Sequence, residues 1–333
     1  MTRNLTKWMG HGGGLADACA AFGGSPGDWV DLSTGINPHA WSGASDAAID
    51  WRRLPDPAAI GELESVAADY FGVPPANICA VPGTELALRM LRDIVSADGV
   101  HRTPCYGTHA VTIAGSRPVA DRDLPEAARQ GRTILFANPG NPDGRLLDHA
   151  MLHHLAATTD ASGGWLVVDE AFADAAPTVS IAPATGRYSR LIVLRSFGKF
   201  FGLAGVRLGF IVAQPLVLDR FRLRLGSWPV STAAIQIGRE AYRDSAWSTA
   251  MRARLQPEAD ALDTILQRHG FTPRGACPLF RLIETNAAAS LFERLARRLI
   301  LTRPFDYEPC WLRIGLPGSA EALERLDDAL SNG

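Results

Sequence analysis

The sequence contains very little lysine. Of the 33 basic residues only Lys7 and Lys199 are lysine, and the rest are arginine. Basic and acidic residues nearly balance, with 33 against 35 and a formal net charge of −2 at pH 7, so no basic excess indicates a nucleic acid or an anionic membrane as a partner. A lysine in this chain is therefore not a routine surface choice, and its position is informative.

Cysteine and long apolar runs are scarce as well. The five cysteines lie far apart without a C-x-x-C pair, which favours reduced thiols over a disulfide framework or a zinc site. No apolar run approaches the roughly 18 residues of a membrane-spanning helix, and residues 1–14 show no apolar core before a cleavage site. We expect a cytoplasmic protein without a metal centre.

What the chain does contain is enough apolar sequence for a sizeable core. It has 333 residues, of which 47% are hydrophobic and 20% charged, and this excludes a disordered or fibrous chain. Short apolar runs alternate with segments of helical spacing such as residues 60–71 and 85–95. The runs are residues 78–81, 133–137, 165–168, 191–194 and 208–212. This alternation predicts an α/β fold with a largely parallel sheet.

The pattern of predicted secondary structure changes near residue 245. Beyond it we expect a long helix, and then a strand at 279–284, a helix at 287–299, a strand at 311–316 and a helix at 320–330. We predict an N-terminal arm at 1–45 that joins the small domain, a large domain at 46–245 and a small α+β domain at 246–333.

Lys199 is the first candidate for chemistry. It follows the apolar run 191–194 and is flanked by Phe197, Phe200 and Phe201. A partly desolvated amine is available for Schiff-base chemistry, whereas the alternative is a snorkelling surface lysine. The near absence of lysine elsewhere favours the chemical interpretation.

Asp169 ends the apolar run 165–168, and a carboxylate at that place is costly unless a cationic group meets it. The alternatives are a turn or helix cap and the acidic magnesium-binding strand of a nucleotide hydrolase. The hydrolase would need a G-x-x-x-x-G-K-[ST] loop, which the sequence does not contain.

Two turns at predicted strand ends complete the candidate site. The stiff loop 138–144 reads N-P-G-N-P-D-G and follows the run 133–137, at the edge where ligands of open α/β sheets gather. Gly83-Thr84-Glu85 opens a helix whose backbone amides could hold a phosphate, and Arg207 could supply the matching cation. Each feature alone is weak, since many turns and helices begin in this way.

In chain order the candidate residues are Gly83, Thr84, Tyr106, Asn141, Asp169, Ser196, Lys199, Arg207 and Arg313. Their motifs are N-P-x-N-P-x-G, D-E-A, S-x-x-K followed by G-L-x-G-x-R, and a late R-I-G. With these motifs the chain resembles, over nearly its whole length, the fold-type I pyridoxal-phosphate enzymes of the class I/II aminotransferase group. The resemblance implies a large domain with a mostly parallel sheet, a small α+β domain, pyridoxal 5'-phosphate as cofactor and a homodimer.

The resemblance also implies roles for individual residues. Lys199 would form the Schiff base with the cofactor, and Asp169 would keep the pyridine nitrogen protonated. Asn141 would bond the phenolic oxygen, Tyr106 would stack on the ring, and Arg313 would take the substrate carboxylate as a fork. The implied phosphate contacts are Gly83, Thr84, Glu85, Ser196 and Arg207.

Several local features look like the threonine-phosphate decarboxylase branch of this group, which serves cobalamin biosynthesis and is akin to histidinol-phosphate aminotransferases. They are His11-Gly12-Gly13, the stretch D-L-S-T-G-I-N-P that contains Asn37, and D-E-A-F with Phe172 where many relatives have tyrosine. This likeness implies decarboxylation of O-phospho-L-threonine to (R)-1-amino-2-propanol O-2-phosphate. It also implies that His11, Gly12, Gly13 and Asn37 contact substrate and that a downstream cobinamide synthase could receive the product.

One position departs from the group. Leu54 stands before Pro55-Asp56, where related aminotransferases place a tyrosine that reaches the cofactor phosphate of the second subunit. Leucine cannot donate that hydrogen bond.

An aminotransferase for a phosphorylated substrate such as histidinol phosphate stays an alternative, as does a catalytically idle protein that binds the cofactor or an effector. No linear motif separates decarboxylation from transamination, because both depend on which bond at the α-carbon stands perpendicular to the ring.

Overall fold

The computed structural model describes residues 6–95 and 98–331. These residues divide into two compact units. The large unit consists of Ala40–Asn141 and Arg145–Thr249, and the small unit of the described residues up to His39, Pro142–Gly144 and those from Ala250 onward. Among the described residues, no helix combines the length and hydropathy needed to span a membrane.

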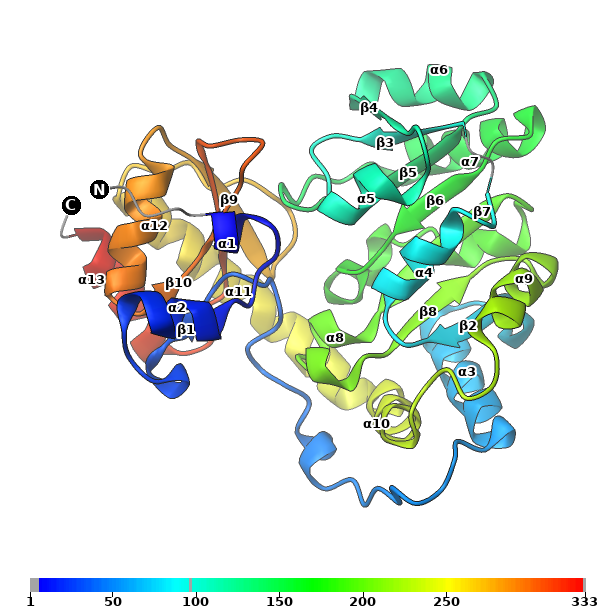
Figure 1. Ribbon diagram of the computed structural model, residues 1–333, viewed down its shortest axis with the longest axis horizontal. Helices are drawn as coiled ribbons and strands as arrows, with labels where there is room; N and C mark the ends of the chain where they lie inside the picture. The colour runs from blue at the N-terminus through cyan, green and yellow to red at the C-terminus, as the bar shows by residue number, and fades with distance from the viewer. Residues whose placement is uncertain (1–5, 96–97, 332–333) are drawn as a thin grey trace. The chain divides into compact units, whose positions relative to one another are not determined.

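A seven-stranded sheet forms the centre of the large unit (Figure 1). Its strands, in spatial order, are β2 (Ile78–Val81), β8 (Gly209–Val212), β7 (Leu191–Ser196), β6 (Leu166–Asp169), β5 (Thr133–Ala137), β3 (Gly99–Arg102) and β4 (Arg117–Val119). β8 runs antiparallel to both of its neighbours, and the other pairs from β7 to β4 are parallel. The predicted mostly parallel sheet is therefore confirmed.

The helices of the large unit connect these strands. They are α3 (Pro57–Phe71), α4 (Thr84–Leu91), α5 (Gly107–Thr112), α6 (Leu124–Arg129), α7 (His149–Ser162), α8 (Phe197–Phe200), α9 (Pro215–Leu225) and α10 (Thr232–Arg243). α3 shows why such segments become helices: Asp56 caps it by accepting the Ala58 amide at 2.8 Å, Pro57 occupies its first turn, and Gly72 ends it at φ +68°.

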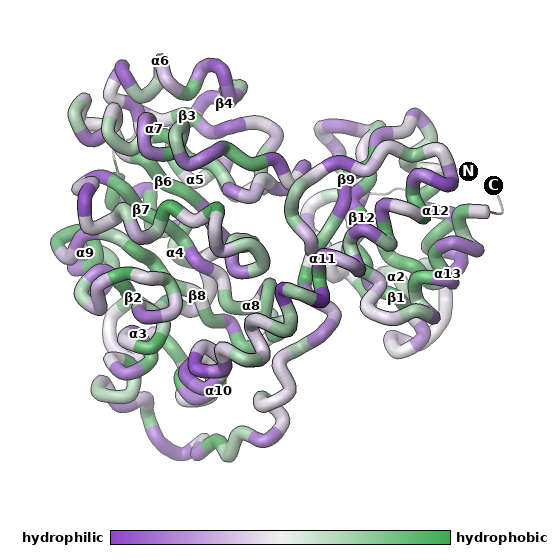
Figure 2. The backbone as a smooth tube through the Cα atoms, turned by 180° about the vertical axis from the view of Figure 1, so that it is seen from behind, coloured by the Kyte–Doolittle hydropathy of each residue, from purple (hydrophilic) through white to green (hydrophobic). Residues whose placement is uncertain are grey.

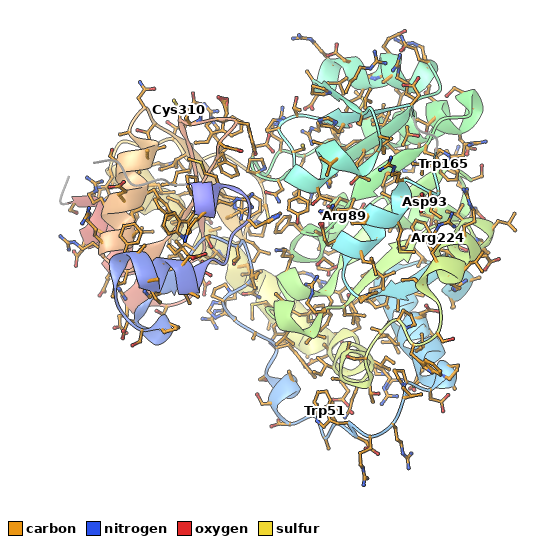
Figure 3. The ribbon with its side chains drawn as sticks, viewed as in Figure 1. Trp51, Arg89, Asp93, Trp165, Arg224 and Cys310 are labelled. Atoms are coloured by element: carbon orange, nitrogen blue, oxygen red, sulfur yellow. The ribbon has the colours of Figure 1, made fainter. Side chains whose placement is uncertain are left out.

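Helices α4 and α9 cover one face of the sheet. Their buried side chains form a core with strand residues that include Val167 and Ile192, both fully buried. In Figure 2 the central strands of this sheet are coloured mostly as hydrophobic, as expected for strands that are buried on both faces. Arg224 on α9 holds the segment after α4 by an ion pair with Asp93, Nε to Oδ2 at 3.6 Å (Figure 3).

The outer edge of β2 is covered by side chains. The Ala80 amide donates to Glu64 Oε1 at 2.8 Å, and Arg222 Nη2 donates to the Ile78 carbonyl at 2.8 Å. Two backbone groups of this edge strand are thereby satisfied without a further strand.

The small unit contains two small sheets. β1 (Val30–Asp31) pairs in parallel with β10 (Ile300–Leu301), and an antiparallel sheet has the order β11 (Arg303–Pro304), β12 (Trp311–Gly315) and β9 (Phe280–Glu284). Its helices are α1 (Thr6–Met9), α2 (Leu15–Phe22), α12 (Ala288–Arg297) and α13 (Ala320–Ser331). Helix α11 (Ser245–Arg268) begins in the large unit and continues into the small one.

Eight short 3-10 helices complete the described secondary structure. They are η1 (Pro26–Asp28), η2 (Ser42–Ser45), η3 (Pro75–Asn77), η4 (Asp121–Asp123), η5 (Ala173–Ala175), η6 (Pro177–Val179), η7 (Ala182–Gly186) and η8 (Ala204–Val206).

Candidate active site

Asp169 lies at the carboxyl end of β6 and is almost fully buried. Its Oδ2 is 3.0 Å from His109 Nε2, and its Oδ1 accepts the Ala171 amide at 3.1 Å. Since a carboxylate oxygen accepts, His109 Nε2 carries the proton of this bond. The hydrogen bond fixes a buried carboxyl group at the edge of the sheet where ligands of parallel sheets bind.

His109 was not singled out from the sequence. It lies on α5, three residues after Tyr106, and is fully buried. The pairing spans 60 residues of sequence, so no local pattern reveals it. The sequence feature that could have identified His109 is its place about one helical turn after Tyr106, the residue expected to stack on the cofactor ring.

Lys199 follows β7 on the short helix α8. Its Nζ is 5.7 Å from the centre of the Phe172 ring. The flanking Phe197 and Phe201 stack on each other with ring centres 4.7 Å apart and are fully buried. Phe197 and Phe200 belong to α8 and their burial fixes this turn in the core, whereas the lysine side chain is only partly buried.

The residues predicted to hold a phosphate come together at the start of α4. Gly83 has φ +88°, and a Cβ there would lie 2.6 Å from Arg207 Nη2. A Cβ at Gly209 would lie 3.0 Å from the Thr84 amide nitrogen, and Gly209 pairs with Ser196 between β8 and β7. Gly83, Thr84, Ser196 and Arg207 therefore surround one helix N-terminus, the natural place for an anion.

Arg207 itself has an unusual backbone. Its φ of +55° lies in the left-handed region, which costs free energy for a residue with a side chain and is found often at functional sites. Its Nη1 donates to the Ala204 carbonyl at 3.3 Å. These features direct the guanidinium to Gly83.

The carboxylate of Glu85 is bonded within the protein. It accepts from the Tyr106 hydroxyl at 3.2 Å, from the Thr108 hydroxyl at 3.0 Å and from Arg89 Nε at 2.9 Å. Burial, followed by the charge of Glu85, raises the pKa of Tyr106. The side chain of Glu85 thus positions Tyr106, and only its backbone amide could serve a phosphate.

Asn141 lies four residues beyond β5, whose last residue Ala137 pairs with Asp169 on β6. Arg145, just beyond this loop, donates to Asp121 Oδ2 at 3.3 Å and to the Thr103 carbonyl at 3.1 Å. These bonds give Arg145 a role in holding the segment before Tyr106.

The small unit contains Arg313 and a second arginine that sequence reasoning missed, Arg303. They are directly opposed on β12 and β11, and both are buried. Arg313 Nη2 donates to the Ser33 carbonyl at 2.6 Å, and Arg303 Nη2 donates to the Gly10 carbonyl at 2.8 Å. Burial, followed by the charge of Arg303, lowers the pKa of Arg313 to about 9. Two neighbouring buried guanidinium groups favour a ligand with more than one negative charge.

The glycine-rich arm belongs to the same unit. The Gly13 amide donates to Ser33 Oγ at 2.8 Å, and a Cβ at Gly12 would lie 2.3 Å from the Ser33 carbonyl oxygen. Asn37 is buried, and its Oδ1 accepts the His39 amide at 3.0 Å. His11 is exposed beside Gly12. The predicted substrate contacts thus gather in the small unit, and the predicted cofactor contacts gather in the large unit.

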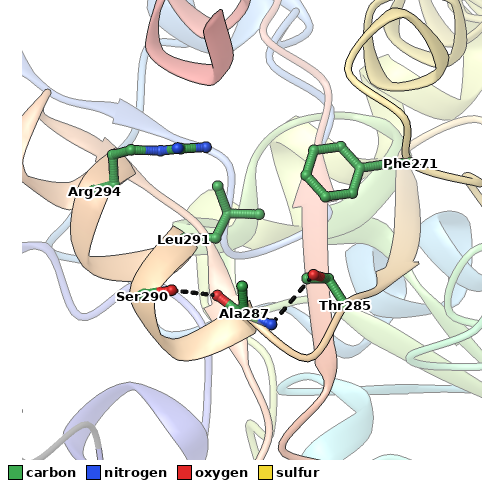
Figure 4. Close-up of a pocket in the computed structure, with 6 residues that line it drawn as sticks. All are labelled: Phe271, Thr285, Ala287, Ser290, Leu291 and Arg294. Carbon is green, nitrogen blue, oxygen red and sulfur yellow. Dashed lines mark hydrogen bonds between the residues drawn. The ribbon is translucent and has the colours of Figure 1, made fainter. Parts of the chain in front are cut away.

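A pocket of about 170 Å³ in the small unit contains none of the predicted site residues. It is lined by Phe271, Thr285, Ala287, Ser290, Leu291 and Arg294 (Figure 4). Across residues 6–95 and 98–331, no three His, Cys, Asp or Glu side chains are grouped so that they could hold a metal ion.

Known proteins resemble this chain in sequence and in fold. Residues 28–330 match the family described as aminotransferase class I and II. The chain is 41% identical over 325 residues to a threonine-phosphate decarboxylase from Sinorhizobium sp, which covers 96% of this chain and 97% of the relative. It is 38% identical over 325 residues to a threonine-phosphate decarboxylase from Pseudomonas aeruginosa, with 96% of each protein covered. A histidinol-phosphate aminotransferase from Thermobifida fusca is 29% identical, covering 90% of this chain and 88% of the relative.

A solved structure has the same fold. Histidinol-phosphate aminotransferase from Sinorhizobium meliloti, in complex with pyridoxal-5'-phosphate, superimposes with a TM-score of 0.78 at 21% identity, covering 90% of this chain and 89% of that one. The predicted fold is confirmed by this match and by the sheet order. With its sequence matched from residue 28 to residue 330, the chain belongs to the aminotransferase class I and II family.

Proposed function

We propose that this chain is a pyridoxal-phosphate-dependent decarboxylase that converts O-phospho-L-threonine to (R)-1-amino-2-propanol O-2-phosphate. The observation that carries the proposal is the pair of threonine-phosphate decarboxylases that are 41% and 38% identical over nearly the full length of both proteins. The opposed, buried Arg303 and Arg313 support it, because the substrate carries a carboxylate and a phosphate.

The residues at the edge of the large sheet fit pyridoxal phosphate. Gly83 leaves no side chain between the α4 N-terminus and Arg207, which suits the phosphate of the cofactor. Asp169, held by His109, offers a buried carboxylate for a protonated ring nitrogen, and Lys199 offers an amine. When bound, the cofactor supplies an aldehyde that attaches an amine covalently and a ring that takes up the electron pair released at the α-carbon.

The chain's own residues supply charge, orientation and protons. Asp169 would hold a proton on the ring nitrogen of a bound cofactor, and Tyr106, oriented by its hydrogen bond to Glu85, would pack against the ring. Lys199 would hold the cofactor through its amine, and it is the candidate acid that would return a proton to the α-carbon of the substrate.

The substrate phosphate has a further task in this proposal. Decarboxylation requires the bond to the carboxylate to stand perpendicular to the ring, so the far end of the substrate must be anchored. Arg313 is the proposed anchor of the carboxylate, and Arg303 with the arm residues His11 to Gly13 is the proposed anchor of the phosphate. Asn37 is a further proposed substrate contact. Unphosphorylated threonine should therefore lose turnover as well as affinity.

The test is a product assay with O-phospho-L-threonine in the presence and absence of a keto acid. The proposal expects carbon dioxide and the amino alcohol phosphate without a keto acid. The histidinol-phosphate aminotransferase that is 29% identical makes transamination the second candidate. Turnover that depends on a keto acid would establish that reaction, and no spectral change with any amino acid would establish an idle binding protein.

We further propose that the chain forms a homodimer. Leu54 is 66% exposed and cannot donate a hydrogen bond to a cofactor phosphate in a second copy, so Arg207 and the α4 N-terminus provide that contact within the chain. Sedimentation equilibrium tests the dimer, and a monomer would contradict it.

A further inference from the structure

Three segments that are far apart in the sequence meet at Ser33, which is buried. Its hydroxyl donates to Asp31 Oδ1 at 2.6 Å and accepts the Gly13 amide at 2.8 Å. Its carbonyl accepts from Arg313 Nη2 at 2.6 Å. One serine therefore joins the arm, the end of β1 and the arginine of β12.

The direction of the hydroxyl is fixed by Asp31. Asp31 Oδ1 accepts the Ser33 amide at 2.9 Å as well as the hydroxyl, and a carboxylate can only accept. The hydroxyl hydrogen therefore points to Asp31, which leaves an oxygen lone pair for the Gly13 amide. Without the carboxylate the hydroxyl would be free to rotate and this pairing would weaken.

The backbone of the junction is held independently of the hydroxyl. The Gly315 amide donates to the Leu32 carbonyl at 2.7 Å, and the Leu32 amide donates to the Leu301 carbonyl at 2.7 Å. Removing the hydroxyl should thus leave the strands and the carbonyl bond to Arg313 in place and release the arm alone. Gly12, with its missing Cβ directly over the Ser33 carbonyl, shows how closely the arm packs here.

We propose that Ser33 is a positioning residue for the substrate anion. Its hydroxyl, oriented by Asp31, holds Gly12 and Gly13 of the arm in a fixed position relative to Arg313. This inference rests on the proposed function, because it takes the anion to be a phosphorylated amino acid. Ser33 acts through Gly13 and Arg313.

The first experiment compares steady-state kinetics of cofactor-loaded variants on O-phospho-L-threonine. Ser33→Ala should raise KM about tenfold and change kcat less than about twofold, since it disturbs the placement of binding groups. Asp31→Ala should reproduce part of this rise, and Asp31→Asn, which keeps the amide oxygen as acceptor, should not. Ser248→Ala is the matched control, because that buried serine hydroxyl has no hydrogen-bond partner in the described structure.

The second experiment needs no substrate. Hydrogen exchange of the Gly13 amide should be at least about tenfold faster in Ser33→Ala than in the wild type and unchanged in Ser248→Ala. A purely structural role would lower the melting temperature without the KM rise. Should Ser33→Ala fail to fold, Asp31→Ala carries both measurements.

An unchanged KM in Ser33→Ala, a loss confined to kcat, or unchanged Gly13 exchange would each overturn the proposal. Failure of the proposed function is recognised separately, because the wild type would then release no carbon dioxide from O-phospho-L-threonine. In that case the KM values are compared with histidinol phosphate and a keto acid as substrates. Hydrogen exchange of the Gly13 amide still tests the role of Ser33, because it needs no substrate.

Discussion

The imidazole of His109 contacts the carboxylate of Asp169 from within the protein, with Nε2 and Oδ2 3.0 Å apart. Asp169 is the residue proposed to hold the charge of the cofactor ring, and His109 orients it. A buried partner of this kind keeps a catalytic group in one geometry.

We expect Asp169→Asn to fold and to lose a hundredfold or more in kcat, on the order of the effect of a preorganised electrostatic contact. His109→Asn, which leaves the carboxylate but moves its partner, should cost about tenfold. Steady-state rates on O-phospho-L-threonine check both. Wild-type rates in Asp169→Asn would reduce that residue to a strand-end cap.

Lys199→Ala should remain folded and lose turnover together with the visible absorption band of the covalently attached cofactor. The basis is the partly buried position of this lysine on α8, near the ring of Phe172. Absorption and circular dichroism spectra are the measurements, and Lys7→Ala, on the exposed end of an ion pair with Asp17, is the control. Normal activity in Lys199→Ala would show that the attachment site is elsewhere.

Arg313→Lys should raise KM strongly although it conserves charge, because an ammonium cannot bind a carboxylate with two parallel hydrogen bonds. Arg303→Lys should behave in the same way, since the two side chains are opposed on β12 and β11. Substrate titration gives the affinities. If neither substitution changed them, anion recognition would have to be assigned to other residues.

The pH dependence follows from the lowered pKa of Arg313, which is about 9. Below that value the guanidinium is charged and binds the anion, so kcat/KM should fall as the pH rises through about 9. Removing the neighbouring charge in Arg303→Gln should move this basic limb to higher pH. A pH profile of kcat/KM is the check, and a limb that stayed in place would remove Arg303 as a cause.

The effect on stability has the opposite sign. The folded-state pKa of Arg313 lies below its ordinary value, so in the pH range between the two the unfolded chain binds more protons than the folded one. This residue's contribution therefore favours folding increasingly as the pH rises from about 9. Comparing urea unfolding of the wild type and Arg313→Met across that range isolates the contribution.

Gly12→Ala should raise KM for the substrate, because the added Cβ would lie 2.3 Å from the Ser33 carbonyl and the arm would have to move. Gly10→Ala is the matched control, since a Cβ there meets nothing within 4 Å. The same kinetic assay serves for both variants. Equal kinetics in the two would mean that the arm does not contribute to binding.

The sequence predicted the strands that are apolar throughout, such as β2 and β5, whose bounds match the runs at 78–81 and 133–137. It missed β3, which contains His101 and Arg102. Both are buried in the structure, where they bond Ser116 and Asp121, and these partners could not be inferred from spacing. The helix predicted at 85–95 ends earlier, at Leu91.

In the candidate site, too, some residues can be recognised from the sequence and others cannot. Lys199 and Asp169 stand out because a charged residue directly after an apolar strand is conspicuous. His109 and Arg303 do not, because one pairs across 60 residues and the other meets Arg313 only when two strands align. The role of Ser33 depends on a hydroxyl direction that no sequence encodes. The predicted domain limits near 45 and 245 stay a prediction.

The covered edge of β2 has a consequence for the behaviour of the protein at high concentration. Ile78–Val81 is a short apolar strand of the kind that adds neighbouring chains, and Glu64 and Arg222 occupy two of the backbone groups that such a chain would need. At the far edge of the sheet, β4 carries Arg117 and Pro118, which also disfavour pairing. We therefore expect neither border of the seven-stranded sheet to recruit further strands readily when the protein is concentrated.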